Sequence, residues 1–220
     1  MKKLIYNRFE KRRINELELV TFPGKIVVVV SPKETGRCVD YLLSQPVLGF
    51  DTETRPSFKR GVHYACSLLQ VSTEDCCFLF RLNYTGLTPD IVRLLEDTTV
   101  TKVGLSWSND ITSLHGVGEF NPGTFVELQD MARQMGIEDQ SLVKLYANIL
   151  GGHISKRERL SNWEQDILRD SQKRYAAIDA WACVKLYNEM TRLKETGDYE
   201  LVIVPDETKQ NDEEDSTKEG

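Results

Sequence analysis

The stretch VLGFDTET, Val47 to Thr54, most constrains what this chain can fold into. It begins as an apolar run typical of a buried β-strand and ends in two carboxylates, Asp51 and Glu53. Residues i and i+2 of a strand point to the same face, so both carboxylates leave the sheet together and repel each other unless a cation lies between them. Hard divalent cations prefer such oxygen ligands. Two interpretations follow: a metal-binding strand end, or a charged strand end that turns into solvent.

Length and composition favour one ordinary folded domain. The chain has 220 residues, of which 40% are hydrophobic and 28% charged, which suits a single soluble domain with one core. The longest apolar run, Ile26 to Val30, is far too short to span a membrane. No apolar signal-peptide core directly follows the basic residues of the first thirteen positions. We therefore expect a cytoplasmic protein that does not contact membranes.

The negative charge is concentrated at the C-terminus. The net charge is −6, and the seven acidic residues and two lysines from Asp206 onward account for −5 of it. The body of the chain is then nearly neutral at −1, which leaves room for basic patches. We expect a basic N-terminal segment over residues 1–20, a folded domain over 21–204 and an acidic, disordered tail over 205–220.

Hydrophobic periodicity predicts a mixed order of strands and helices. Strands are predicted at Ile26–Val30, Val47–Glu53, Ser67–Ser72, Cys76–Leu82, Lys102–Trp107 and Phe125–Leu128. Helices are predicted from Ser31 or Pro32 to Leu43, from Pro89, after a cap at Ser108 or Asn109, after a cap at Asp130, over Leu142–Leu150 and over about Ser171–Leu193. Three successive strands followed by alternating helices and strands indicate an α/β fold with helices packed on a mixed sheet.

Two further acidic residues lie at places where a carboxylate can face the strand end. Asp110 falls in the first turn of a helix after a strand, where the helix dipole favours an anion; simple capping would explain it equally. Asp179 and Tyr175 are spaced i, i+4 on the last helix, so they share one face. The alanines beside them let that helix approach the sheet closely. A solvated acid beside a packed tyrosine is the alternative.

Several sequence blocks occur in a characteristic order between about Val47 and Met190. They are GFDTE, SLLQVS, KVGLSWSNDITSL, FVELQDMA, SLVKLYANILGG, RLSNWE and YAAIDAWACVKLYNEM. Together they resemble the DEDDy subgroup of 3′-to-5′ exonucleases, and within it Werner-type exonuclease domains and, more distantly, ribonuclease D. The resemblance implies a single α/β domain with a ribonuclease-H-like mixed β-sheet flanked by helices on both faces.

The resemblance also implies a catalytic site. Asp51, Glu53, Asp110 and Asp179 would hold two divalent ions, Mg²⁺ or Mn²⁺, and Tyr175 would orient the attacking water. Two ions roughly 3.5 to 4 Å apart can stabilise both the attacking and the leaving oxygen of an in-line displacement at phosphorus. An unperturbed tyrosine titrates near ~10, so Tyr175 suits hydrogen bonding better than proton abstraction at neutral pH.

Substrate contacts are expected beside this site. The backbone of Thr52, between the two strand carboxylates, would approach the terminal nucleotide. Lys156, Arg157 and Arg159 form the densest basic cluster of the body, shortly before Trp163, and are candidates for holding the backbone of an entering strand. A solvated loop with Trp163 packed in the core is the alternative.

These expectations combine into a metal-dependent 3′-to-5′ exonuclease. It would act on single-stranded or recessed 3′ ends of nucleic acid, with DNA slightly preferred over RNA, and release nucleoside 5′-monophosphates. The alternatives are a non-catalytic nucleic-acid-binding module with the same fold, a ribonuclease that trims RNA 3′ ends, and an enzyme for a small nucleotide. The sequence shows no second nucleic-acid-binding module after Met190, so we expect modest affinity with a strong salt dependence.

Overall fold

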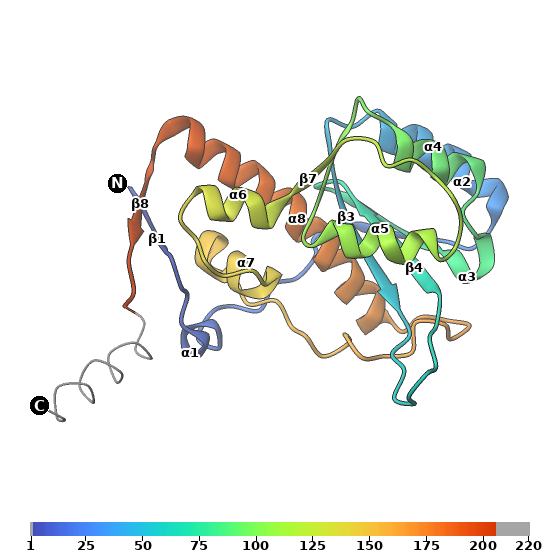
Figure 1. The fold of residues 1–220 in the computed structure, drawn as a ribbon, viewed down its shortest axis with the longest axis horizontal. Helices are drawn as coiled ribbons and strands as arrows, with labels where there is room; N and C mark the ends of the chain where they lie inside the picture. The colour runs from blue at the N-terminus through green and yellow to red at the C-terminus, as the bar shows by residue number, and fades with distance from the viewer. Residues whose placement is uncertain (1, 206–220) are drawn as a thin grey trace, which may run out of the picture.

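The computed structural model describes residues 2–205 (Figure 1). Except for Pro205, the predicted acidic tail lies outside this range. The centre is a six-stranded mixed sheet. In spatial order its strands are β2 (Lys25–Val29), β5 (Cys76–Arg81), β4 (Cys66–Ser72), β3 (Val47–Thr54), β6 (Thr101–Gly104) and β7 (Phe125–Glu127). Strand β3 pairs antiparallel with β4 and parallel with β6. The prediction of a mixed sheet is confirmed.

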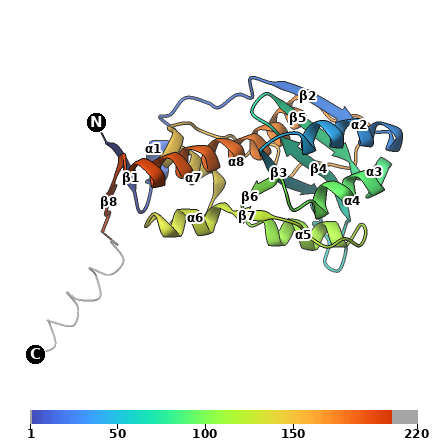
Figure 2. The same ribbon diagram turned by 90° about the horizontal axis from the view of Figure 1, so that it is seen from above.

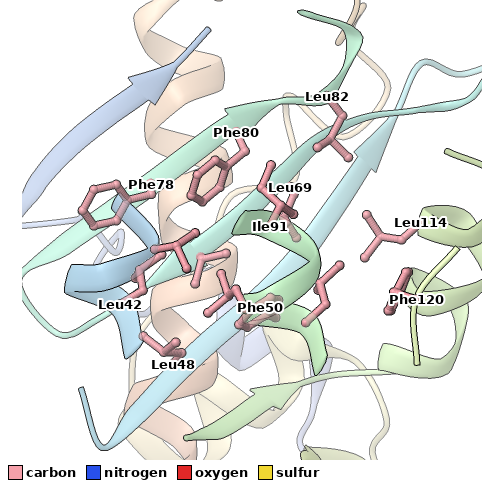
Figure 3. Packing of buried hydrophobic residues seen from close by; sticks show 14 of the residues in the cluster. Leu42, Leu48, Phe50, Leu69, Phe78, Phe80, Leu82, Ile91, Leu114 and Phe120 are labelled. Carbon is pink, nitrogen blue, oxygen red and sulfur yellow. The ribbon is translucent and has the colours of Figure 1, made fainter. Parts of the chain in front are cut away.

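Strand β3 separates two layers of helices. Leu48 and Phe50 point to one face, where they pack with residues of α2 (Pro32–Leu43) and α4 (Pro89–Glu96) in a buried cluster (Figure 3). The alternate residues of β3, which include Asp51, point to the other face, against α8 (Asp170–Thr196). Helices therefore cover both faces, as expected, and the acidic side of β3 faces the last helix.

The contact between β3 and α8 is unusually close. A Cβ atom built on Gly49 would lie 1.9 Å from the carbonyl oxygen of Ala180, so no larger residue fits there. Ala176, Ala177 and Ala180 are fully buried. These small residues bring the helix backbone against the strand, as predicted, and set the height at which side chains of α8 meet those of β3. Figure 2 shows α8 continuing from the sheet toward the N-terminus.

The N-terminal segment is built into the fold beside the C-terminal strand. Strand β1 (Lys3–Tyr6) pairs parallel with β8 (Tyr199–Val202) in a separate two-stranded sheet, followed by the short helix α1 (Lys11–Ile14). Ile5 is fully buried. The sequence indicated only a basic segment here and predicted neither strand. Within residues 2–205 no helix combines the length and the apolar character needed to cross a membrane.

Several predicted boundaries are wrong near the turns. The strand expected to run to Trp107 ends at Gly104, and Trp107 is the first residue of α5 (Trp107–His115), with Ser106 as its N-cap in place of Ser108 or Asn109. The chain turns early because Ser106 adopts a left-handed conformation, with φ of 60°.

Two other boundaries also differ from the prediction. The strand expected to end at Leu128 ends at Glu127, which caps α6 (Leu128–Gln134), whereas Asp130 lies inside the first turn. Leu82 belongs to a short helix, α3 (Leu82–Thr85), rather than to β5. The predicted helix at Leu142–Leu150 is confirmed as α7, which ends at Gly151 in a left-handed conformation.

Candidate active site

Three carboxylates meet where β3 faces α8. Asp51 and Glu53 come from the strand, Asp179 comes from the helix, and one ligand oxygen of each lies within 4.8 Å of the others. The resemblance of the sequence blocks implied that these three residues would converge, although Asp179 is more than a hundred positions from the other two. Glu53 is 9% exposed and Asp179 is 6% exposed. Asp51 is half-buried. Acids this close together and this shielded from water favour protons or a cation among them.

Asp110 adjoins this group through Thr52. The Thr52 hydroxyl donates a hydrogen bond of 2.6 Å to Oδ1 of Asp110, which lies in the first turn of α5 as predicted. The charge of Asp110 contributes to the raised pKa of both Asp51 and Glu53. Thr52 was predicted to contact substrate through its backbone; its side chain has the separate role of fixing the direction of the fourth carboxylate.

Burial raises the pKa of all four carboxyl groups, and repulsion among them adds to this at Asp51 and Glu53. Burial is the largest cause in each case; it raises the pKa of Glu53 from 4.5 to about 9, and those of Asp110 and Asp179 from 3.8 to about 7. The pKa of Asp51 is also well above its ordinary value, through burial and then through the other three acids. A set of carboxylate oxygens that resists ionisation without added positive charge fits hard divalent cations such as Mg²⁺ or Mn²⁺.

Tyr175 lies one turn before Asp179 on the same face of α8. Burial, followed by the charges of Asp179, Glu53 and Asp51, raises the pKa of its phenol above the ordinary value of 10. The hydroxyl therefore keeps its proton at neutral pH and acts as a hydrogen-bond donor. Trp163, fully buried, lies with its ring centroid 6.0 Å from that of Tyr175 and supports the tyrosine ring.

A pocket of about 270 Å³ opens over the carboxylates. Asp51, Asp179 and Tyr175 form part of its wall, and Lys156 and Arg159 line it as well. The positive charge of Lys156 lowers the pKa of Asp179, and that of Arg159 lowers the pKa of Glu53. Two members of the predicted basic cluster therefore face the site.

The third member of that cluster lies elsewhere. Arg157 lines a neighbouring pocket with Leu19 and Arg174 and does not line the pocket over the carboxylates. The cluster loop is exposed while Trp163 is packed in the core. The alternative, an exposed loop with Trp163 packed in the core, is therefore confirmed. Lys156 and Arg159 of that loop nevertheless line the pocket over the carboxylates.

Glu127 is a supporting residue that sequence reasoning missed. Its carboxylate accepts hydrogen bonds from the backbone N–H groups of Ser106 (2.9 Å), Trp107 (3.2 Å) and Gln129 (3.1 Å). One side chain thus caps the starts of both α5 and α6, and it holds the left-handed turn that leads to Asp110. The only signal in the sequence was an acid at the end of a predicted strand, in FVELQD.

The floor of the site contains further residues to which the sequence assigned no role. Gln70 is the register partner of Asp51 across β3 and β4, is fully buried, and has no hydrogen-bond partner for either side-chain atom within the part of the chain that is described. Cys183 is also buried, and burial followed by the nearby acids raises its pKa well above the ordinary value. Its thiol donates a hydrogen bond to the backbone carbonyl of Asp179 (3.4 Å).

A mixed sheet whose central strand carries two carboxylates faces a late helix that carries Tyr and Asp, and together they form an acidic site on a ribonuclease-H-like fold, of a composition that fits a divalent cation. The family model described as 3′-5′ exonuclease matches residues 27–195. The chain therefore belongs to the 3′-5′ exonuclease family, as its sequence blocks predicted.

Curated relatives agree with this assignment. The mouse bifunctional 3′-5′ exonuclease/ATP-dependent helicase WRN is 30% identical over 192 residues, which cover 83% of this chain and 14% of that protein. A 3′-5′ exonuclease of Arabidopsis thaliana is 30% identical over 152 residues, covering 66% of this chain and 53% of the relative. The chain thus spans only part of the length of each of these relatives.

Solved structures confirm the fold. The EXO domain of Aedes aegypti Nibbler superposes with a TM-score of 0.68 at 24% identity, covering 77% of this chain and 89% of that domain. Escherichia coli RNase D gives a TM-score of 0.66 at 19% identity, covering 77% and 46% respectively. The predicted ribonuclease-H-like architecture is therefore correct.

Proposed function

We propose that this chain hydrolyses phosphodiester bonds at the 3′ end of nucleic acid and releases nucleoside 5′-monophosphates. The observation that carries the proposal is the cluster of Asp51, Glu53 and Asp179 where β3 faces α8, with Asp110 of α5 joined to it through Thr52 and a pocket at Asp51 and Asp179. Membership of the 3′-5′ exonuclease family supports the same chemistry. A non-catalytic module would have no need to keep four acids together at the cost of their burial.

Asp51, Glu53, Asp110 and Asp179 would hold two divalent cations, Mg²⁺ or Mn²⁺. When bound, such ions stabilise the charge that develops on the attacking and leaving oxygens during displacement at phosphorus. The first, second and last of these residues are close enough to share a ligand sphere, and Thr52 orients Asp110 beside them. Added cations would relieve the crowding of negative charge that raises the pKa of Asp51 and Glu53.

Tyr175 would position the nucleophile rather than deprotonate it. Its phenol keeps a proton at neutral pH because burial and three nearby acids raise its pKa. A hydroxyl that lines the pocket beside Asp51 and Asp179 can donate a hydrogen bond to a water or to a phosphate oxygen there. Holding a reactant in line contributes to the rate without any proton transfer to the tyrosine.

Lys156 and Arg159 would hold the phosphates of the strand as it enters. Both are exposed and line the pocket, so their charges can pair with a backbone of any sequence. We expect single strands or recessed 3′ ends, because the terminal nucleotide must reach carboxylates at the bottom of a pocket. Affinity should fall steeply with salt.

DNA is the slightly favoured substrate, on the likeness to the WRN protein. Two structural neighbours were solved with other ligands, an RNA strand and a dinucleotide. Trypanosoma brucei RNase D was solved in complex with RNA U12 (TM-score 0.66, 19% identity). Brucella melitensis NrnC was solved bound to pGG (TM-score 0.60, 16% identity) and with bound Mg²⁺ (TM-score 0.59, 16% identity). An RNA strand and a dinucleotide therefore belong beside DNA in one assay.

The test is a gel time course with matched 5′-labelled DNA and RNA strands, single-stranded and recessed, and a labelled dinucleotide. Reactions contain Mg²⁺, Mn²⁺ or EDTA, with Asp51→Asn as the inactive comparison. The proposal predicts a metal-dependent ladder that shortens from the 3′ end and is absent in the variant. No cleavage of any substrate by folded, metal-supplied protein would favour the binding module, and preferred RNA would favour the trimming ribonuclease.

A further inference from the structure

A second pocket adjoins the one over the carboxylates. It has a volume of about 320 Å³ and shares Ser141, Val143, Ile154 and Lys156 with the catalytic pocket. The rest of its wall consists of Lys11, Ile14, Asn15, Lys144 and His153. We call this the N-terminal pocket. A ligand that extends out of the catalytic pocket past Lys156 would enter it directly.

The outer wall of the N-terminal pocket comes from α1, which precedes residues 27–195, the part matched by the family. That wall is held firmly. The Asn148 side chain accepts a hydrogen bond from the backbone N–H of Tyr6 (2.9 Å) and donates one to its carbonyl (2.6 Å). Asp139 accepts from the backbone N–H of Phe9 (2.6 Å). The pocket is therefore preformed, and a ligand would not have to order the segment on binding.

The same segment is tied down on its far side. The backbone N–H of Val20 donates to the carbonyl of His153 (2.9 Å), and the N–H of His153 donates to the carbonyl of Glu18 (2.9 Å). Phe9 and Ile14 are buried in a small cluster with Ala147 of α7. Both ends of the wall are thus fixed to the body of the domain that carries the catalytic pocket.

The chemistry of the N-terminal pocket suits an anion. Its lining includes three lysines and one histidine and no carboxylate. Within the run Lys11-Arg12-Arg13, Arg12 pairs with Glu10 at 2.7 Å and the guanidinium of Arg13 lies 4.6 Å from the centre of the Tyr6 ring. Lys11 is exposed, lines the pocket and has no ion-pair partner among residues 2–205.

Lys144 contributes less charge than Lys11. Its ammonium pairs with Asp139 at 2.6 Å, the same carboxylate that accepts the Phe9 N–H through its other oxygen. Lys156, at the boundary of the two pockets, is exposed. The positive charge available to a ligand therefore follows a path from Lys156 to Lys11, away from the carboxylates.

We propose that the N-terminal pocket binds the backbone phosphate of a nucleotide upstream of the 3′-terminal one, with Lys11 as its principal contact. This inference rests on the proposed function, since it requires a strand whose 3′ end lies at the carboxylates. It makes the N-terminal segment a part of the substrate site and gives the chain a preference for strands over dinucleotides.

The test compares wild-type protein with Lys11→Gln, using Lys33→Gln as the matched control. Lys33 is an exposed lysine of α2, and Figure 1 shows α2 on the other side of the central sheet region from α1. Cleavage rates are measured on a ten-nucleotide strand and on a dinucleotide. Binding of the labelled ten-nucleotide strand in EDTA is measured by fluorescence anisotropy at several salt concentrations, and thermal melting checks that each variant is folded.

For Lys11→Gln we expect the ratio of kcat/KM for the ten-nucleotide strand to that for the dinucleotide to fall about fivefold. The slope of log affinity against log salt should become shallower by about 0.7, the loss of one phosphate contact to a single strand. Lys33→Gln should match wild type in both measurements.

The other outcomes separate the two proposals. Equal ratios and equal salt slopes for wild type and Lys11→Gln would overturn the inference while leaving the exonuclease intact. An equal loss on the dinucleotide and the longer strand would also overturn it, because Lys11 would then act at the terminal nucleotide. If wild type cleaves nothing, the proposed function fails, and an unchanged salt slope in Lys11→Gln would then reject the phosphate contact as well.

Discussion

Burial, more than repulsion, sets the protonation of the catalytic side chains. It is the largest cause of the raised pKa for Asp51, Glu53, Asp110 and Asp179. Repulsion from neighbouring acids adds to it at Asp51 and Glu53, while the hydrogen bonds donated by Thr52 and Tyr175 oppose it at Asp110 and Asp179. The site is therefore costly to the metal-free protein, as expected where function and stability compete.

Tyr175→Phe tests the role of the phenol. We propose that the hydroxyl orients the nucleophile and does not bind a cation. The variant should therefore cleave about a hundredfold more slowly. Its thermal stabilisation by Mg²⁺ should equal that of wild type. Single-turnover rates on a labelled strand and melting curves with and without Mg²⁺ provide the check. Loss of the Mg²⁺ effect in Tyr175→Phe would show instead that the phenol helps to hold the cations.

At the scale of elements, the contact of β3 with α8 positions the carboxylates. Gly49→Ala would bring a Cβ within 1.9 Å of the Ala180 carbonyl oxygen, and neither backbone can move without displacing Asp51 or Asp179. We expect a loss of about 3 kcal/mol in the free energy of unfolding together with loss of cleavage. Denaturant unfolding measures the first quantity.

Gly118→Ala is the control for that substitution. The nearest atom to a Cβ added at Gly118 is a methyl carbon of Leu87 at 3.4 Å, and the next lie beyond it. This variant should lose less than about 1 kcal/mol. If Gly49→Ala unfolded at the same denaturant concentration as Gly118→Ala, the close packing of strand and helix would not be what fixes the site.

The Glu127 carboxylate holds the starts of both α5 and α6. Glu127→Gln leaves one acceptor oxygen where the carboxylate has two, and the starts of α5 and α6 compete for it. We expect a loss of about 1 to 2 kcal/mol in unfolding free energy. Cleavage should also slow, because the turn before α5 determines where Asp110 lies.

Asp130→Asn is the matched control for Glu127→Gln. Asp130 is the residue that the sequence favoured as the cap of α6, but it lies inside the first turn of the helix and forms a surface ion pair with Arg133. Its substitution should cost less than about 0.5 kcal/mol and leave cleavage unchanged. The reverse order of effects would restore the capping role predicted from sequence.

The elements that carry the catalytic acids were predictable because their patterns are local. The alternation of β3 and the small-residue face of α8 each indicate which side of the element is buried, but the meeting of Asp51 with Asp179 was implied only by the resemblance. The resemblance of the sequence blocks supplied the identity of the partners. The same local reasoning gave the ends of α2 and α7 correctly.

Features that depend on distant partners were not predictable in this way. β1 and β8 have four residues each and pair across nearly the whole chain, so neither shows a useful period. Glu127 bonds to backbone groups about 20 positions earlier. Lys156 and Arg159 differ from Arg157 in the pocket they face because an irregular loop has no periodicity from which direction can be deduced.

For the whole molecule, the raised pKa values predict how stability depends on pH. Glu53, Asp110 and Asp179 titrate at about 9, 7 and 7 in the folded protein, against 4.5, 3.8 and 3.8 ordinarily. Between about pH 4 and pH 9 the folded, metal-free protein thus binds more protons than the unfolded chain, and these groups lower the free energy of unfolding as pH rises. Cations displace the protons, so Mg²⁺ should raise Tm more at pH 8 than at pH 5.

Melting curves in EDTA and in Mg²⁺ at both pH values measure this effect, with Glu53→Gln as the comparison that removes one titrating group. The pKa of Glu189 is lowered to about 2, first by its hydrogen bond with Arg192. The lowered pKa of Glu189 therefore stabilises the folded protein fully above pH 4.5, and this stabilisation is lost only as pH falls toward 2. It does not change between pH 5 and pH 8. An Mg²⁺ effect equal at pH 5 and pH 8 would contradict the account.

The products formed in ¹⁸O-labelled water show whether the four carboxylates support hydrolysis at a 3′ end. A ten-nucleotide strand is incubated with Mg²⁺ and either wild-type protein or Asp51→Asn, and the products are analysed by mass spectrometry. We predict nucleoside 5′-monophosphates carrying one ¹⁸O in the phosphate, formed by wild type and absent with EDTA or Asp51→Asn. Nucleoside 3′-phosphates, or equal product from Asp51→Asn, would contradict the proposed function.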